Sequence, residues 1–129
     1  MSLYNYALAL EYADIVHAFV LTENNGVEPI LMNEMGDAGQ AIGIVQFHPA
    51  DFAVYYGRSL RFPRSVKHTW AEAEIVACAS FWDTEQWLDV DLRVQAWNLG
   101  VQGVKDGERN PDYLQRWTMN MNRIRGKGA

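Results

Sequence analysis

The first regular hydrophobic pattern in the chain runs from Tyr4 to about Thr22. Its apolar residues recur at helical spacing and leave Glu11 and Asp14 on another face, as in an amphipathic helix. The run Glu23-Asn24-Asn25-Gly26 follows, and asparagine and glycine readily adopt the left-handed conformation that ends a helix. We therefore expect the first helix to stop at this run.

The helical period is lost between Asn25 and Gln46, where glycine, asparagine and aspartate are frequent. We expect a long structured loop here, with short strands around Pro29–Met32 and Ile42–Phe47. Loops of this length inside a compact domain are usually functional.

The pattern then returns to helices. Pro49 suits the first turn of a short helix through Tyr55. Thr69-Trp70-Ala71-Glu72 is typical of a capping box, and the helix that it begins is expected to run to about Glu85 or Trp87. One face of this helix is apolar and comprises Ala71, Ile75, Cys78, Ala79 and Trp82.

Two more helices follow towards the C-terminus. Asp89 or Asp91 is expected to cap a helix through Val101, and Asn110-Pro111 to cap the last one. The last helix has an apolar stripe formed by Tyr113, Leu114, Trp117, Met121 and Ile124. No repeat or linker divides the 129 residues. The sequence thus predicts one mainly helical domain over 1–129, with a small irregular or β lobe after the first helix.

Composition narrows the classes of function. The net charge of −5 argues against a nucleic-acid partner, because phosphate binding needs a basic surface. The N-terminal segment lacks a basic start, and Glu11, Asp14 and His17 interrupt its apolar residues, so it resembles neither a signal peptide nor a membrane span. We expect no signal peptide, no membrane insertion and a monomer.

Metal and thiol chemistry find no support in the sequence. The one cysteine, Cys78, lies in an apolar run and is interpreted as a small buried side chain. His17 and His68 have no metal-ligand spacing to another histidine, cysteine or acidic cluster. We therefore expect neither a metal nor a cofactor.

Glu23 is the candidate for acid chemistry. It follows Phe19, Val20 and Leu21, and burial beside such residues would raise the pKa of a carboxyl. A carboxylic acid that is still protonated near neutral pH can protonate the leaving oxygen of a glycosidic bond. A glycine for close approach, two amides and two aromatic rings would suit a sugar site around it, namely Gly43, Gln46, Asn98, Trp97 and Tyr113.

Three segments resemble motifs of goose-type lysozymes and lytic transglycosylases, and they occur in the same order. GDAGQAIGIVQFHP resembles the GLMQ-type signature, AWNLGVQGV is similar to the AYNAG motif, and NPDYLQRW is similar to the later stretch with a tyrosine near the catalytic acid. The resemblance extends from Glu23 to Trp117. It implies a lysozyme-like α+β fold with Glu23 as general acid/base. It also implies that Gly43 and Gln46 border the cleft, and that Trp97, Asn98 and Tyr113 contact the sugar or orient the acid.

The resemblance implies bacterial peptidoglycan as the substrate, cleaved at the β-1,4 bond between N-acetylmuramic acid and N-acetylglucosamine. Asp37 can hold the attacking water of a hydrolase, which requires roughly 6.5–9.5 Å between two carboxyls. His48 stands near the place of a second water-holding aspartate, and this favours a transglycosylase, in which the muramoyl 6-hydroxyl attacks instead. A short wall-cleaving domain without a signal peptide is typical of phage endolysins, which leave the host cytoplasm through a holin or are carried in the virion.

Other interpretations remain open. Glu23 could be a solvated helix end with Glu34 as the acid, Asp37 could be only a turn residue, and Asn98 could brace a helix. A non-catalytic sugar-binding or virion structural module with a lysozyme fold is one alternative function, since a fold does not guarantee activity. A chitinase-like glycosidase that acts on another N-acetylglucosamine polymer is a second alternative.

Overall fold

A computed structural model of the chain describes residues 11–24, 35–36, 41–42, 55 and 70–126, and the statements below concern these residues. Helix is their main secondary structure, as the hydrophobic pattern predicts.

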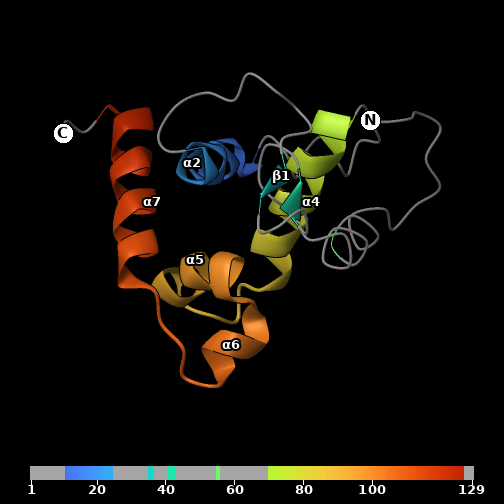
Figure 1. Cartoon of the computed structure of the whole chain (residues 1–129). Helices are drawn as coiled ribbons and strands as arrows, with labels where there is room; N and C mark the ends of the chain where they lie inside the picture. The colour runs from blue at the N-terminus through green and yellow to red at the C-terminus, as the bar shows by residue number, and fades with distance from the viewer. Residues whose placement is uncertain (1–10, 25–34, 37–40, 43–54, 56–69, 127–129) are drawn as a thin grey trace.

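The helices are α2 (Ala13–Glu23), α4 (Trp70–Thr84), α5 (Val90–Leu99), α6 (Val101–Lys105) and α7 (Pro111–Ile124). Figure 1 shows α2 between α7 and α4, with α5 and α6 below them. The C-terminal helix therefore returns to pack against α2, the first helix that the structure describes.

Two short strands lie in the chain between α2 and α4. They are β1 (Met35–Gly36) and β2 (Ala41–Ile42), which pair in antiparallel fashion with Met35 opposite Ile42. Of the strands predicted from the sequence, the one over Pro29–Met32 lies outside the described residues, and the one over Ile42–Phe47 is described only at Ile42. The helix expected up to Tyr55 is described only at Tyr55, which is helical.

Two of the predicted helix starts are confirmed by their caps. The Asp89 side chain accepts a hydrogen bond from the Leu92 backbone N–H (3.1 Å), so Asp89 and not Asp91 caps α5. Asn110 accepts from the backbone N–H of Tyr113 at 3.1 Å, and proline occupies the first turn of α7. The capping box at Thr69 lies outside the described residues.

The helix predicted through Val101 is wrong in its last two residues. Gly100 has φ 83° and ψ 151°, a backbone conformation that only glycine adopts readily, so α5 ends at Leu99 and α6 begins at Val101. A glycine inside a helical pattern does not reveal whether the helix continues through it.

The end of α2 lies at Glu23, as the sequence predicted. Asn25 and Gly26 lie outside the described residues, and Asn24 has φ −119° and is not left-handed. Its backbone N–H donates to the Leu21 carbonyl oxygen (3.1 Å) and its side-chain amide donates to the Val20 carbonyl oxygen (2.7 Å). The asparagine ends the helix at Glu23 by supplying donors to carbonyls that the helix leaves unpaired.

Phe19 of α2 lies at the centre of the core, between side chains of three other helices. Its ring centroid is 5.2 Å from that of Trp97, 5.6 Å from Trp117, 5.9 Å from Trp82 and 6.4 Å from Phe81. Aromatic pairs at these separations add to the stabilisation from burial of their surface. This cluster joins α2 to α4, α5 and α7.

The helix α4 is buried on more sides than its predicted apolar face. Cys78, Ala79 and Trp82 are buried as expected, but so are residues between and before them. These additional buried residues are Glu74, Val76, Ala77, Ser80 and Phe81. The predicted apolar face is thus buried at Cys78, Ala79 and Trp82, and α4 is also covered on further sides by the rest of the domain.

The turn between α4 and α5 is fixed by Arg93. Its guanidinium lies 4.3 Å from the ring centroid of Trp82 and donates to the carbonyl oxygens of Trp82 (3.4 Å), Gln86 (3.3 Å) and Leu88 (2.9 Å). These carbonyls lie near or beyond the C-terminal end of α4, where helix carbonyls lack intrahelical partners. Burial lowers the pKa of Arg93 from its ordinary value, and the nearby Tyr12 and Asp89 oppose this.

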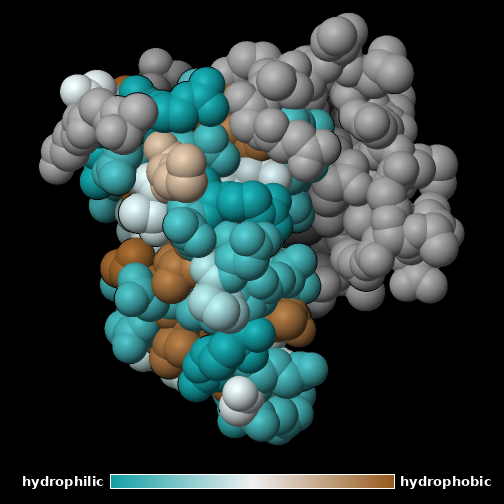
Figure 2. Space-filling view, turned by 60° about the vertical axis from the view of Figure 1, so that its left-hand side comes forward, coloured by the Kyte–Doolittle hydropathy of each residue, from teal (hydrophilic) through white to brown (hydrophobic). Residues whose placement is uncertain are grey.

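The described part of the surface is mainly hydrophilic. On the face in Figure 2, apolar side chains form small patches separated by polar ones. The helices of the described residues include none that is both long and apolar enough to cross a membrane.

Candidate functional site

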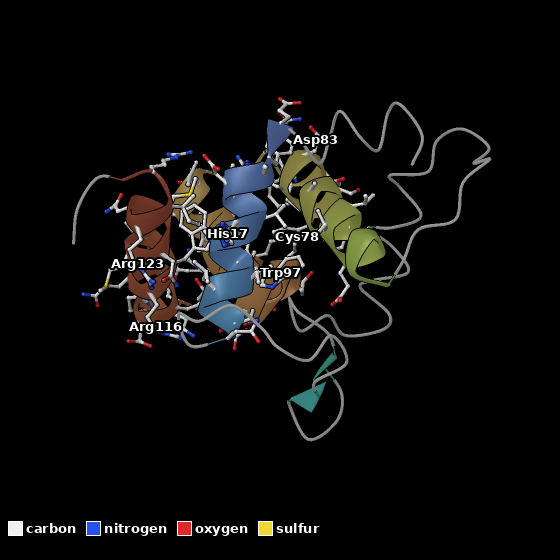
Figure 3. All side chains as sticks on the ribbon, turned by 90° about the horizontal axis from the view of Figure 1, so that it is seen from above. His17, Cys78, Asp83, Trp97, Arg116 and Arg123 are labelled. Atoms are coloured by element: carbon white, nitrogen blue, oxygen red, sulfur yellow. The ribbon has the colours of Figure 1, made fainter. Side chains whose placement is uncertain are left out.

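Glu23 is the last residue of α2 and is partly buried. The turn before it consists of the buried residues Phe19, Val20, Leu21 and Thr22. Figure 3 shows α2 between α7 and α4, so the carboxyl is at the end of a helix that is covered on both sides. This is the apolar neighbourhood that the sequence predicted for the acid.

Tyr113 is the predicted site residue that the structure brings close to Glu23. It lies in the first turn of α7, only 1% of its surface is exposed, and its Oη has no hydrogen-bond partner among the described residues. Burial raises its pKa well above the ordinary value, the charge of Glu23 raises it further, and Arg116 partly opposes both. The phenol therefore stays protonated.

A second carboxyl, that of Glu74, joins this group. Glu74 and Cys78 are four residues apart on α4, and both are fully buried. Burial raises the pKa of the Cys78 thiol, and the charges of Glu23 and Glu74 raise it further. A neutral buried thiol is a poor nucleophile, which agrees with the structural role predicted for this cysteine. Glu23, Glu74, Cys78 and Tyr113 are called the acid cluster below.

Glu74 was missed in the sequence analysis. A glutamate in a helix is usually solvated, and the predicted apolar face omitted it. Its spacing of four residues from Cys78 places both on one face of α4, and this spacing could have identified it.

Glu85, the other buried glutamate of the described residues, is held by hydrogen bonds from two aromatic side chains. Its carboxylate accepts hydrogen bonds from the Tyr55 hydroxyl (3.2 Å) and from Nε1 of Trp87 (2.6 Å). It lies just after the C-terminal end of α4, whereas Glu74 lies in the N-terminal half of that helix.

The two predicted sugar contacts on α5 both make contacts with other helices. Trp97 is partly buried, and its ring centroid lies 4.9 Å from that of Phe81 and 5.2 Å from that of Phe19. Asn98 is exposed and accepts a hydrogen bond from the side chain of Asn110 at 2.7 Å, which links the end of α5 to the start of α7.

The remaining predicted site residues, Asp37, Gly43 and Gln46, lie outside the described residues, as do Glu34 and His48. Within the described residues, no group of three or more histidine, cysteine, aspartate or glutamate side chains is arranged to hold a metal ion.

Comparison with protein-family models, with curated proteins and with solved structures found no match to the chain. The function therefore has to be inferred from its residues and their placement.

The acid cluster combines groups that can carry a proton. It offers one partly buried carboxyl at a helix end, a second carboxyl in the interior, and a phenol held in its neutral form. Because Glu74 is fully buried, only Glu23 of the two carboxyls is open to a substrate.

Proposed function

We propose that the chain is a glycosidase that cleaves the β-1,4 bond between N-acetylmuramic acid and N-acetylglucosamine in bacterial peptidoglycan, with Glu23 as its general acid. The observation that supports this most is the position of Glu23, at the end of α2 after a buried turn and close enough to Cys78 and Tyr113 for its charge to raise the pKa of both. A carboxyl in such a position can act as a general acid when it is protonated.

The proposal includes a lysozyme-like α+β fold for the chain. A lysozyme-like α+β domain would place a small lobe after the first helix, and the β1–β2 pair lies at that point in the chain. Asp37, Gly43 and Gln46 would then border the cleft from this lobe. Trp97 and Asn98 would support the cleft from α5, and the burial of Tyr113 favours orientation of the acid over direct contact with the sugar.

The proposed reaction begins when the Glu23 carboxyl gives its proton to the glycosidic oxygen. The bond from C1 of the muramoyl residue to that oxygen breaks, and the N-acetylglucosamine leaves with a free 4-hydroxyl. The muramoyl 6-hydroxyl then attacks C1, and its proton returns to the Glu23 carboxylate, leaving a 1,6-anhydro end. In a hydrolase, water held by Asp37 would attack C1 instead.

The transglycosylase is the preferred outcome. His48 stands where a second water-holding acid is expected from the resemblance, and Glu74 is too deeply buried to hold water against a substrate. The proposed substrate also fits a phage endolysin, released from the host cytoplasm through a holin or carried in the virion.

The test is clearing of purified peptidoglycan by the wild type and by Glu23→Gln, with mass spectrometry of the released fragments. Glu11→Gln is the matched control, because Glu11 is exposed and lies before the opposite end of α2. We expect Glu23→Gln to lose at least about 100-fold in rate, in the range of general acid catalysis, and the control to keep full rate. Anhydro ends would indicate a transglycosylase and reducing ends a lysozyme.

Other outcomes would reject the proposal in different ways. Equal clearing by wild type and Glu23→Gln would exclude Glu23 and make Glu34→Gln the next variant. No clearing by the wild type, with cleavage of chitin, would favour the chitinase-like glycosidase. No cleavage of either polymer would favour the non-catalytic module.

A further inference from the structure

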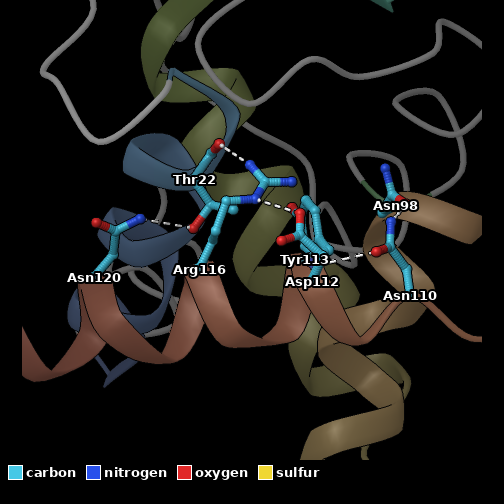
Figure 4. Close-up of polar contacts among 7 residues, drawn as sticks. All are labelled: Thr22, Asn98, Asn110, Asp112, Tyr113, Arg116 and Asn120. Carbon is cyan, nitrogen blue, oxygen red and sulfur yellow. Dashed lines mark hydrogen bonds and ion pairs between the residues drawn. The ribbon is translucent and has the colours of Figure 1, made fainter.

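The residue before Glu23 is held by the C-terminal helix. Thr22 is 3% exposed, and its hydroxyl donates to the Ala18 carbonyl oxygen (2.7 Å) and accepts from the side-chain amide of Asn120 (3.1 Å). Figure 4 shows this bond between α7 and the end of α2. Asn120 is itself buried, and its side-chain oxygen accepts from Arg123 at 3.3 Å, which fixes the orientation of the amide.

A second residue of α7, Arg116, reaches the same point. Its guanidinium donates to the Thr22 carbonyl oxygen at 3.5 Å, forms an ion pair with Asp112 at 3.1 Å, and lies 5.5 Å from the ring centroid of Tyr113. Arg116 and Asn120 are one helical turn apart, so they contact Thr22 from one face of α7 (Figure 4). Thr22, Arg116 and Asn120 are called the α2 clamp below.

The place of these contacts is unusual for simple packing. The last four carbonyls of a helix have no intrahelical donor, and helix ends fray where nothing replaces it. Arg116 and Asn120 supply side-chain donors to Thr22, the residue that precedes Glu23. The apolar core already anchors α2 through Phe19, one turn earlier.

We propose that Arg116 and Asn120 are positioning residues, which hold the end of α2 through Thr22 and thereby fix the Glu23 carboxyl against the bond to be cleaved. This inference rests on the proposed function. A catalytic group must be held close to its productive geometry by neighbours that are themselves fixed, and a misplacement of about 1 Å can cost about 100-fold in rate.

The experiment compares Thr22→Val with Thr118→Val. Thr22→Val keeps the shape of the side chain and removes the hydroxyl that Asn120 contacts. Thr118 has the same kind of bond, from its hydroxyl to the Leu114 carbonyl oxygen at 2.8 Å, but it is exposed on α7. Steady-state kinetics on soluble glycan chains from peptidoglycan give kcat and KM at 25 °C, and circular dichroism monitors folding.

We expect Thr22→Val to lower kcat by about 10- to 100-fold with KM within about twofold of the wild type, because the acid is displaced while the substrate still binds. Thr118→Val should keep both constants, and Thr22→Ser should restore most of kcat because it returns the hydroxyl. Arg116→Gln, at a partly exposed position where the fold tolerates change, should lower kcat by a smaller factor.

The outcomes separate this inference from the proposed function. If Glu23→Gln is inactive but folded Thr22→Val and Arg116→Gln keep the wild-type kcat, the clamp is only structural and the inference is wrong. If Glu23→Gln is as active as the wild type, the proposed function fails first. Should Thr22→Val not fold at 25 °C, Arg116→Gln decides the question, and a wild-type kcat in this variant would overturn the inference.

Discussion

Tyr113 shows at the scale of one residue how burial sets chemistry. Its hydroxyl is removed from water, and its oxygen has no hydrogen-bond partner among the described residues. A buried polar atom without such a partner has a desolvation cost that no described contact offsets. Under the proposed function, the hydroxyl orients the Glu23 carboxyl.

Tyr113→Phe is expected to preserve stability at pH 7 and to reduce its loss in alkali. The folded-state pKa of Tyr113 is raised, so the unfolded chain releases this proton first; the contribution of Tyr113 to stability is complete below about pH 10 and declines above it. The decline approaches about 1.4 kcal/mol per pH unit for each such group, and Cys78, with the same sign, contributes from about pH 8.5. Urea unfolding between about pH 7 and pH 11 measures this.

At pH 7 the variant should unfold with a free energy equal to the wild type or about 1 kcal/mol higher, because only an unpartnered hydroxyl is lost. Cys78→Ala serves as the control that removes the other titrating group, and it should remove only the decline that begins below pH 10. A decline as steep in Tyr113→Phe as in the wild type would contradict the prediction.

At this scale the sequence predicted Glu23 as the acid, because a carboxyl at an apolar helix end is visible in the local pattern. It predicted Tyr113 as a site residue only through the resemblance to a family motif, whereas the burial of Tyr113 agrees with its place in the predicted apolar stripe. It did not identify Glu74, since the burial of a glutamate depends on which helices surround it. The sequence also could not predict the hydrogen bond between Asn98 and Asn110, because a contact between two helices depends on how they pack and not on the pattern of either helix alone.

At the scale of the elements, Gly100 determines where α5 ends and α6 begins. The backbone leaves the helical conformation at this residue, with φ 83° and ψ 151°. This conformation sets the direction in which α6 continues after α5. A Cβ atom at this position would meet nothing within 4 Å, so the cost of any side chain comes from the backbone alone.

Gly100→Ala is expected to destabilise the protein by about 1–3 kcal/mol, the usual cost of a non-glycine residue in this region of backbone space. Lys105→Ala, an exposed change in α6, should stay within about 0.5 kcal/mol of the wild type. Thermal and urea unfolding give both values. A Gly100→Ala variant as stable as the wild type would mean that α5 and α6 can join without a positive φ.

The helix starts were more predictable than this break. Asp89 and Asn110 cap their helices through bonds to a residue three positions later, so the whole interaction is contained in four residues of sequence. Gly100 was ambiguous because glycine is compatible with both a continuing and a broken helix. The hydrogen bonds of Arg93 to carbonyls near the end of α4 also depend on the turn that they fix.

The whole molecule is united by the aromatic core around Phe19. The hydrophobic pattern identified Phe19, Trp82 and Trp117 as apolar, and they are buried. The pattern could not predict that Trp82 and Trp117 stack with their centroids 5.9 Å apart, because contacts between distant helices depend on the path of the chain between them. Periodicity therefore predicts which face of a helix is buried, whereas the residues that contact this face depend on how the helices pack.

Phe19→Ala is the change that tests whether the described helices form one cooperative unit. Loss of the central ring leaves a cavity among four aromatic neighbours, and we expect the free energy of unfolding to fall by about 3–5 kcal/mol. Far-ultraviolet circular dichroism reports the helices and tryptophan fluorescence reports the core, so coincident transitions would show two-state behaviour. Phe19→Leu, which keeps most of the volume, should lose less and retain the same coincidence. If the two probes separated in Phe19→Ala while the wild type stayed coincident, the described helices and the aromatic core would no longer unfold as one cooperative unit.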